Sequence, residues 1–382
     1  MLTLIKDGLV YVNSSKRFLP LDILIEDGRI AKIGERGALD SADALKISAD
    51  GCRLCAGFID VHTHGIAGAD FIYADGEALS RMARAYLSHG VTTVMPTLAS
   101  APLDVMIDAA RRIDSFSDFN EGARFCGVHL EGRYLNPLKR GAHAPELLAL
   151  PNADELCEFD KLSLDALHIS AAFELDADKS FLRKALDVGA TLSLGHTNAS
   201  YAEAKALEDA GVSAYTHLYN AMPPLHHRDG GPIAACLEGD AYAELICDGI
   251  HISPEVVRLT KRIKGDRLTL ISDSMEATDS PDGDYSIAGN PVRVEGGIAR
   301  TLDGALAGST LTLDRALENL MAFCAIPLED AIVSATEAPA KEIGIFEDCG
   351  SIDIGKRADI LFIDGTSFKI ERIMRGGELL IA

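Results

Sequence analysis

The sequence predicts an α/β protein, a (β/α)₈ TIM barrel with a small β-sandwich-like domain formed from both chain termini. Three observations lead to this fold class. Short apolar segments alternate with amphipathic stretches through the centre, both ends are rich in short strand patterns, and polar residues follow the central apolar segments. Strands that alternate with helices are typical of parallel sheets closed into barrels. A doubly wound open sheet is the alternative fold, but no G-x-G-x-x-G turn supports it.

The two ends of the chain resemble each other in pattern. Predicted strands lie at 2–5, 9–12, 21–26 and 30–33, and again at 360–363, 370–374 and 378–381. Asp27-Gly28 is a hairpin signal between two of them. We therefore expect residues 1–54 and 352–382 to pair into one small β-domain that brackets a central domain, residues 55–351.

The centre contains eight apolar segments of strand length, separated by helical patterns. The predicted strands are 58–61, 92–95, 125–130, 167–172, 191–194, 214–216, 243–247 and 268–272. Amphipathic stretches such as 78–89, 103–116, 179–188 and 201–210 lie between them. Continuous apolar strands covered by helices indicate a barrel in which all strands run in parallel.

The composition of the chain excludes some classes of binding partner. The 382 residues include 36 Lys and Arg against 58 Asp and Glu, a net charge of −22, which argues against binding nucleic acid or an anionic membrane. The first residues lack the apolar core of a signal peptide, and no apolar run has the roughly 18 residues of a bilayer span, so we expect a cytoplasmic protein. The eight cysteines lie mostly in apolar segments, and we interpret the Cys52/Cys55 C-x-x-C pair as structural.

Histidines and carboxylates follow the predicted strands, and strand ends converge on one mouth in a barrel. His62 and His64 follow the first strand two residues apart, so both side chains point the same way and can reach one ion. Glu131, His196 and His217 end the third, fifth and sixth strands. Together they form a His/Glu set that leaves a position open for water, as catalytic zinc sites do. Each residue alone has a structural alternative, such as a salt bridge from Glu131 to Arg133.

Asp273 ends the eighth strand and faces the same mouth. A metal ion lowers the pKa of a bound water from near 16 to about 7, and a nearby carboxylate can then take its proton and pass it to a leaving nitrogen. The alternative role for Asp273 is a helix N-cap. Residues of the following loops are expected to contact the substrate: Ala142, His143, Asn220, Ala221, Arg228 and His251. The forked donors of Arg228 suit a phosphate.

These motifs resemble those of the N-acetylglucosamine-6-phosphate deacetylases of the amidohydrolase superfamily along nearly the whole chain. The resembling segments are Gly57-Phe58-Ile59-Asp60-Val61-His62-Thr63-His64-Gly65, Gly127-Val128-His129-Leu130-Glu131-Gly132, Lys139-Arg140-Gly141-Ala142-His143, Gly195-His196-Thr197-Asn198-Ala199, Thr216-His217-Leu218-Tyr219-Asn220-Ala221-Met222, Asp248-Gly249-Ile250-His251, Ile271-Ser272-Asp273-Ser274-Met275 and Leu306-Ala307-Gly308-Ser309. Their order along the chain also matches that of the family.

The resemblance implies metal-dependent removal of the acetyl group from an N-acetyl amino-sugar 6-phosphate by a homodimer. It implies that Glu131, His196 and His217 hold the principal divalent ion and that His62 and His64 hold a second one, with Zn, Fe, Mn and Co as candidates. It further implies that Asp273 is the general base and acid and that His143 lies by the acetyl carbonyl. The sugar phosphate would then be held by Ala142, Asn220, Ala221, Arg228 and His251, some of them donated across the dimer.

Two positions depart from the family pattern, and three other functions stay open. Ala56 and Arg133 stand where the family usually has proline, and Arg133 is expected to alter the entrance or the substrate preference. The N-acetylgalactosamine 6-phosphate enzyme is the nearest alternative. A cyclic-amide hydrolase is disfavoured because residues 169–174 hold no metal-bridging lysine. A catalytically inactive scaffold of this fold is disfavoured because every ligand candidate is present.

Overall fold

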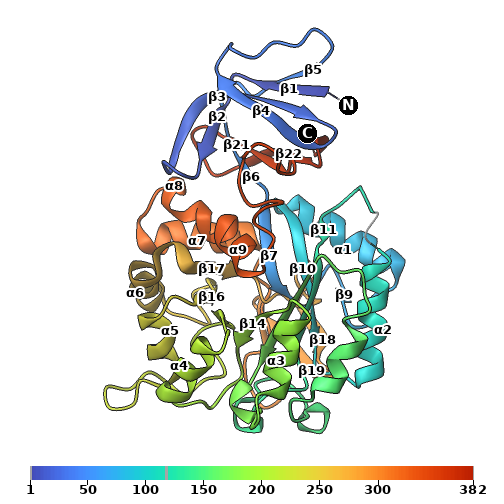
Figure 1. The fold of residues 1–382 in the computed structure, drawn as a ribbon, viewed down its shortest axis with the longest axis vertical. Helices are drawn as coiled ribbons and strands as arrows, with labels where there is room; N and C mark the ends of the chain where they lie inside the picture. Colours follow the sequence, from blue (N-terminus) through green and yellow to red (C-terminus); the bar gives the residue numbers. More distant parts are fainter. Residues whose placement is uncertain (1, 117–118, 382) are drawn as a thin grey trace.

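A computed structural model describes residues 2–116 and 119–381. The central part is a parallel barrel surrounded by helices, and a second sheet, built from both ends of the chain, lies at one end of the molecule (Figure 1). The predicted fold class is confirmed. The domain boundaries at 54/55 and 351/352 stay a prediction, although strands β1–β6 and β21–β23 all belong to the second sheet.

The barrel strands follow the predicted order. They are β7 Phe58–Thr63, β10 Val91–Ala99, β11 Arg124–Phe125 with β12 Gly127–Glu131, β13 Ala166–Ala171, β14 Thr191–Leu194, β15 Ala214–Tyr215, β16 Tyr242–Ile246 and β17 Leu268–Ile271. Each pairs in parallel with its neighbour. Beyond β17 the ring closes at the mouth, where Asp273 N–H donates to His62 O at 2.9 Å and His64 N–H donates to Ser274 O at 2.8 Å. Closure therefore joins the first and last strands at His62, His64 and Asp273, three of the predicted site residues.

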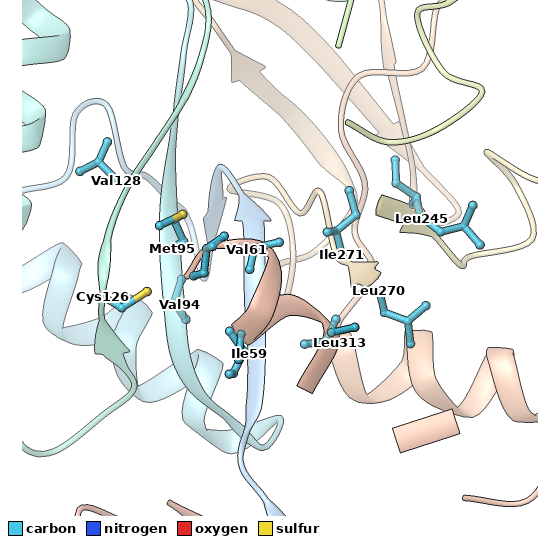
Figure 2. Packing of buried hydrophobic residues seen from close by; sticks show 14 of the residues in the cluster. Ile59, Val61, Val94, Met95, Cys126, Val128, Leu245, Leu270, Ile271 and Leu313 are labelled. Atoms are coloured by element: carbon cyan, nitrogen blue, oxygen red, sulfur yellow. The ribbon is translucent and has the colours of Figure 1, made fainter. Parts of the chain in front are cut away.

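Helices cover the outside of the barrel. They are α1 Gly76–Ser88, α2 Leu103–Asp114, α3 Ser180–Asp187, α4 Tyr201–Asp209, α5 Gly231–Glu238, α6 Pro254–Lys264, α7 Leu313–Cys324, α8 Leu328–Ala331 and α9 Glu337–Glu342. Local signals fix their starts: the Asp75 side chain caps α1, and Ser200 forms a capping box with Glu203 at α4. Ile59 and Val61 of β7 pack with Val94 of β10 and with the first residue of α7, Leu313 (Figure 2). This shared core holds the strand ends in place.

The second sheet contains β1 Leu2–Lys6, β2 Leu9–Val12, β3 Arg17–Glu26, β4 Arg29–Glu35, β5 Leu45–Ser48, β6 Cys52–Ala56, β21 Ile360–Asp364, β22 Ile370–Arg375 and β23 Glu378–Ile381. Strand β3 pairs with β2 through its first half and with β1 and β4 through its second half, so the sheet turns along this strand. Asp27-Gly28 turns β3 into β4 with positive φ at both residues, as predicted for a hairpin.

Cys52 and Cys55 lie three residues apart on β6 and face different cores, one in the terminal sheet and one in the barrel. Both are free and buried, which agrees with a structural role for the C-x-x-C pair. Among the described residues, no helix is long and apolar enough to cross a bilayer.

The prediction missed a three-stranded antiparallel sheet near the mouth, β18 Gly283–Ile287, β19 Asn290–Glu295 and β20 Ile298–Thr301. A signal was present: Val292 and Val294 alternate with polar residues before the Gly296-Gly297 turn. Gly65–Ile66 (β8) and Ala69–Asp70 (β9) form a smaller two-stranded sheet after β7.

Candidate metal and substrate site

Six polar side chains converge at the mouth of the barrel. His62 lies near the end of β7 and His64 directly after it, Glu131 is the last residue of β12, and His196, His217 and Asp273 each come two residues after their strands. All six are buried, between 0% and 7% exposed. The structure thus brings together every residue predicted to bind metal or to move protons.

Glu131 occupies the centre of this group. Its Oε1 lies 3.1 Å from His196 Nε2 and 3.0 Å from His217 Nε2. Its Oε2 lies 3.4 Å from His62 Nε2 and 3.1 Å from His64 Nε2. Each carboxylate oxygen therefore faces a different pair of imidazoles, which is the geometry a carboxylate needs to bridge two cations.

Asp273 contacts two of the histidines and also faces the cavity. Its Oδ1 lies 3.2 Å from His64 Nε2 and 3.5 Å from His62 Nε2, so it could complete the second cation position. It also lines the cavity above the site, where it can meet a water or a substrate nitrogen.

Hydrogen bonds to the Nδ1 atoms of two histidines show which ring nitrogen carries the proton and which presents a lone pair to the centre of the site. His196 Nδ1 lies 2.8 Å from Lys139 O, and because a carbonyl only accepts, Nδ1 carries the proton and Nε2 presents a lone pair. His62 Nδ1 lies 3.0 Å from Glu244 Oε2, which sets the same tautomer. Metal-ligating histidines usually donate their outer nitrogen in this way.

These inward lone pairs fit a metal ion. His196 Nε2 and His217 Nε2 lie 3.1 Å apart, close to the ~3.3 Å between two ligands of a tetrahedral ion with bonds of about 2.0–2.1 Å. His62 Nε2 is fully buried and makes no hydrogen bond with the described residues. Lone pairs that face one another inside a protein need a cation between them, either a proton or a metal.

The pKa shifts of these groups describe the site with protons between the facing lone pairs. Burial alone raises the pKa of Glu131, but His62, His196 and His217 hold it well below its ordinary value. Burial lowers the pKa of His64, yet Asp273 and Glu131 raise it to about 9. Because a metal ligand must be deprotonated, metal binding here would release protons.

The backbone at the strand ends is unusual. His196, His217 and Asp273 have φ values of +46°, +30° and +48°, a region that side-chain-bearing residues rarely adopt. Such strain persists only where the surrounding structure imposes it, and it often marks functional sites. At Gly195, before the first of these turns, a Cβ would lie 2.6 Å from Thr216 side-chain atoms, so glycine permits the two neighbouring turns to approach.

A cavity of about 200 Å³ opens above the six residues. Five of the six predicted substrate residues line it: Ala142, His143, Asn220, Ala221 and His251. Arg228 does not; it is exposed on the loop before α5 and contacts His227 Nε2 at 2.8 Å. No lysine or arginine of the described chain lines the cavity.

His251 and His143 are held by partners that sequence reasoning did not assign. Asp248 Oδ2 lies 2.7 Å from His251 Nδ1, and the other oxygen accepts the His251 and Ile250 N–H groups. Ser100 Oγ lies 2.9 Å from His143 Nδ1. Burial and the charge of His196 lower the pKa of His143 to about 3, so its ring is neutral.

Two buried carboxylates lie beneath the site and were also missed. Glu244, in the middle of the apolar strand β16, contacts His62 on one side and lies 3.4 Å from His168 Nε2 on the other. The ligand-type atoms of His168, Glu244 and Glu342 lie within 4.8 Å of one another. A glutamate inside an otherwise apolar strand was the available signal, because its burial is costly without a partner.

Arg133 does not pair with Glu131, so the alternative salt bridge is wrong. Its side chain contacts Glu155 at 3.3 Å and does not line the cavity. With φ at +65°, its backbone leaves the extended conformation directly after β12. The expected effect of Arg133 on the entrance therefore finds no support in its position.

Comparison with known proteins gives one consistent result. The amidohydrolase family model matches residues 53–380. An N-acetylgalactosamine-6-phosphate deacetylase of Escherichia coli O157:H7 is 32% identical, covering 97% of this chain and 99% of that protein. An N-acetylglucosamine-6-phosphate deacetylase of Vibrio furnissii is 34% identical, covering 93% and 89%. A mutant N-acetyl-D-glucosamine-6-phosphate deacetylase of Mycobacterium smegmatis, solved with N-acetyl-D-glucosamine-6-phosphate, superposes with a TM-score of 0.88 at 28% identity over the whole of both chains.

Proposed function

We propose a hydrolytic function for this chain, which belongs to the amidohydrolase family: it hydrolyses the acetamide of N-acetylglucosamine 6-phosphate to glucosamine 6-phosphate and acetate. One observation carries the proposal. Glu131 presents its two oxygens to two pairs of imidazole nitrogens at the floor of a cavity, which is a site for cations beside a space for a small substrate.

The metal is a divalent ion, with Zn, Fe, Mn and Co as candidates. His196, His217 and Glu131 would hold the principal ion, and His62 and His64 would hold a second one next to the other oxygen of Glu131. A divalent ion supplies Lewis acidity: it lowers the pKa of a water it binds to about 7 and polarises a carbonyl oxygen.

Asp273 would move the proton. As the oxygen of the attacking water bonds to the acetyl carbon, the Asp273 carboxylate accepts a proton from that water. As the C–N bond breaks, Asp273 returns the proton to the departing nitrogen, so that the products are the free amine and acetic acid, which ionises to acetate and releases the second proton to solvent. Its Oδ1 near His64 Nε2 and its exposure to the cavity suit both steps.

His143 would stabilise the carbonyl oxygen. The ring lines the cavity and is neutral, so one ring nitrogen can donate to an oxygen that gains negative charge. A well-placed donor of this kind typically contributes about 3 kcal/mol. Ala142, Asn220, Ala221 and His251 would hold the sugar phosphate from the cavity walls.

The phosphate requires more positive charge than the cavity walls of one chain provide. Arg228 lies outside the cavity of its own chain, and we place it at the phosphate of a second copy, in a homodimer. All eight cysteines are free, in keeping with the reducing cytoplasm in which we place the reaction.

The galactosamine analogue is the second candidate substrate. The Escherichia coli relative is named for that sugar and covers this chain as fully as the relatives named for glucosamine. The two substrates differ in the configuration of one hydroxyl.

Acetate release tests the proposal. The purified protein, with its metal quantified, would be assayed with N-acetylglucosamine 6-phosphate and with N-acetylgalactosamine 6-phosphate. Turnover of the first supports the proposed reaction, and the ratio of the two kcat/KM values assigns the sugar. Failure to release acetate from either substrate, with metal bound, overturns the proposed substrate and leaves another N-acyl compound.

A further inference from the structure

Ser100, the residue directly after β10, lies against the ring of His143. Its Oγ is 2.9 Å from His143 Nδ1, and its backbone nitrogen is 3.4 Å from the same atom. Ser100 is 1% exposed and His143 is 5% exposed, so water does not compete for these contacts.

The hydrogen bonds around Ser100 have one self-consistent direction. The Ser100 backbone N–H can only donate, and its hydrogen-bond acceptor among the described residues is His143 Nδ1. The Arg133 N–H donates to Ser100 Oγ at 3.0 Å, which leaves the hydroxyl proton available for His143. Both Ser100 donors therefore point at Nδ1, and Nδ1 must be the acceptor.

A neutral imidazole that accepts at Nδ1 carries its proton at Nε2. His143 Nε2 lies on the metal side of the ring, 3.9 Å from Glu131 Oε2. We propose that Ser100 is a positioning residue that keeps the His143 proton on Nε2, so that this atom donates to the carbonyl oxygen of the substrate. The inference rests on the proposed function, because it gives the donor a substrate oxygen to meet.

The local backbone is built for this contact. A Cβ at Gly132 would lie 2.4 Å from Ser100 N, so only glycine lets the end of β12 approach the end of β10 this closely. The next N–H along the chain, that of Arg133, donates to Ser100 Oγ. Two adjacent strand ends thus cooperate to fix one hydroxyl group beneath one histidine.

The test is a double-mutant cycle of acetate release with Ser100→Ala, His143→Ala and the double variant. We expect Ser100→Ala to lower kcat roughly 10- to 100-fold, the usual loss when a partner behind an active-site histidine is removed, with KM changed less than about threefold. In the His143→Ala background the same change should cost less than about twofold, because no ring remains to orient. Equal losses in the two backgrounds would overturn the proposal.

Ser193→Ala is the matched control, since it removes a buried hydroxyl that contacts Thr216 at 2.7 Å and does not touch His143. It should leave kcat within about twofold of the unmodified protein, and a loss as large as that of Ser100→Ala would indicate a general packing effect.

Nitrogen-15 NMR of histidine-labelled, zinc-loaded protein reads the tautomer directly. The His143 signal, assigned with His143→Gln, should report a protonated Nε2 in the unmodified protein and a mixture in Ser100→Ala. A protonated Nδ1 in the unmodified protein would also overturn the proposal. This readout needs no turnover, so it separates failure of the inference from failure of the proposed reaction.

Discussion

Single residues at the mouth differ in how far sequence alone could assign them. The convergence of the six proposed metal and proton residues could be predicted, because each lies at a strand end and all barrel strands end on one rim. Arg228 could not be placed, since a loop residue carries no periodicity that fixes its direction. Ser100 was missed because its 2.9 Å contact with His143 joins segments that lie far apart in the chain. Asp248 lies only three residues before His251, so its contact with that ring is local, and sequence reasoning overlooked it.

Asp273→Asn tests the proton-transfer role. Asparagine keeps the shape but cannot take up a proton, so we expect kcat to fall about 10³-fold while the bound metal per chain stays within error of the unmodified protein. Acetate release and elemental analysis provide the two measurements. Asp273→Asn with near-normal turnover would remove Asp273 from the mechanism, and loss of metal would make it chiefly a ligand.

Metal stoichiometry tests the two halves of the site. Glu131 faces His196 and His217 with one oxygen and His62 and His64 with the other, so we expect two ions per chain. His64→Ala should then retain about one ion, and His196→Ala should lose the principal ion together with most activity, since a three-ligand set reduced to two binds weakly. One ion per chain in both the unmodified protein and His64→Ala, measured by elemental analysis after gel filtration, would restrict the site to one ion, and two ions retained in His64→Ala would remove His64 from the ligands.

At the scale of secondary structure, the strands and turns that position these residues could be predicted only in part from the sequence. The eight barrel strands, seven strands of the terminal sheet and four of the helices could be predicted from the spacing of their apolar residues, because a buried face requires apolar residues at regular intervals. The left-handed backbone at His196 and His217 could not, because it is imposed by packing between neighbouring strand ends. The β18–β20 sheet was missed because its short strands follow the last barrel strand, in a region for which no element was predicted.

Gly195→Ala tests that packing. The added Cβ would meet the side chain of Thr216 at 2.6 Å, and because Thr216 precedes His217, both turns must shift. We expect a loss of about 1–3 kcal/mol in the free energy of unfolding, typical of overpacking, together with weaker metal binding. Gly76→Ala is the control, because Gly76 opens helix α1 with open space around it. Denaturant unfolding and metal titration would measure both effects, and equal behaviour of the two variants would contradict the argument.

At the scale of the whole molecule, a column of buried ionisable side chains lies beneath the mouth of the barrel. Glu244 connects His62 of the site to His168 and lies close to Glu342, the last residue of α9. This column is a property of the closed fold, because its members come from β7, β13, β16 and α9, which meet only when the barrel is complete. The sequence of any one of these elements shows only a polar residue among apolar ones and does not identify its partners.

Glu342 gives this column a dependence on pH. Burial, followed by the charge of Glu244, raises the pKa of Glu342 well above its ordinary value, so the folded protein keeps a proton that the unfolded chain releases above a pH of about 4.5. Folding therefore costs free energy as the pH rises above that value, and the cost is absent below it. Glu342→Gln removes the titrating group and keeps the shape. We expect its Tm to exceed that of the unmodified protein by about 2–4 °C at pH 8 and by little at pH 5.

Thermal unfolding at both pH values, with metal held in excess, measures the difference. Glu26→Gln is the matched control, because Glu26 is exposed at the end of β3 and its removal should give the same Tm change at the two pH values. A Glu342→Gln effect that does not grow with pH would mean that Glu342 is ionised in the folded protein. Its negative charge would then need a cation beside His168 and Glu244. In that case Glu342 would belong to an ion pair and would not be a protonated, neutral carboxyl group.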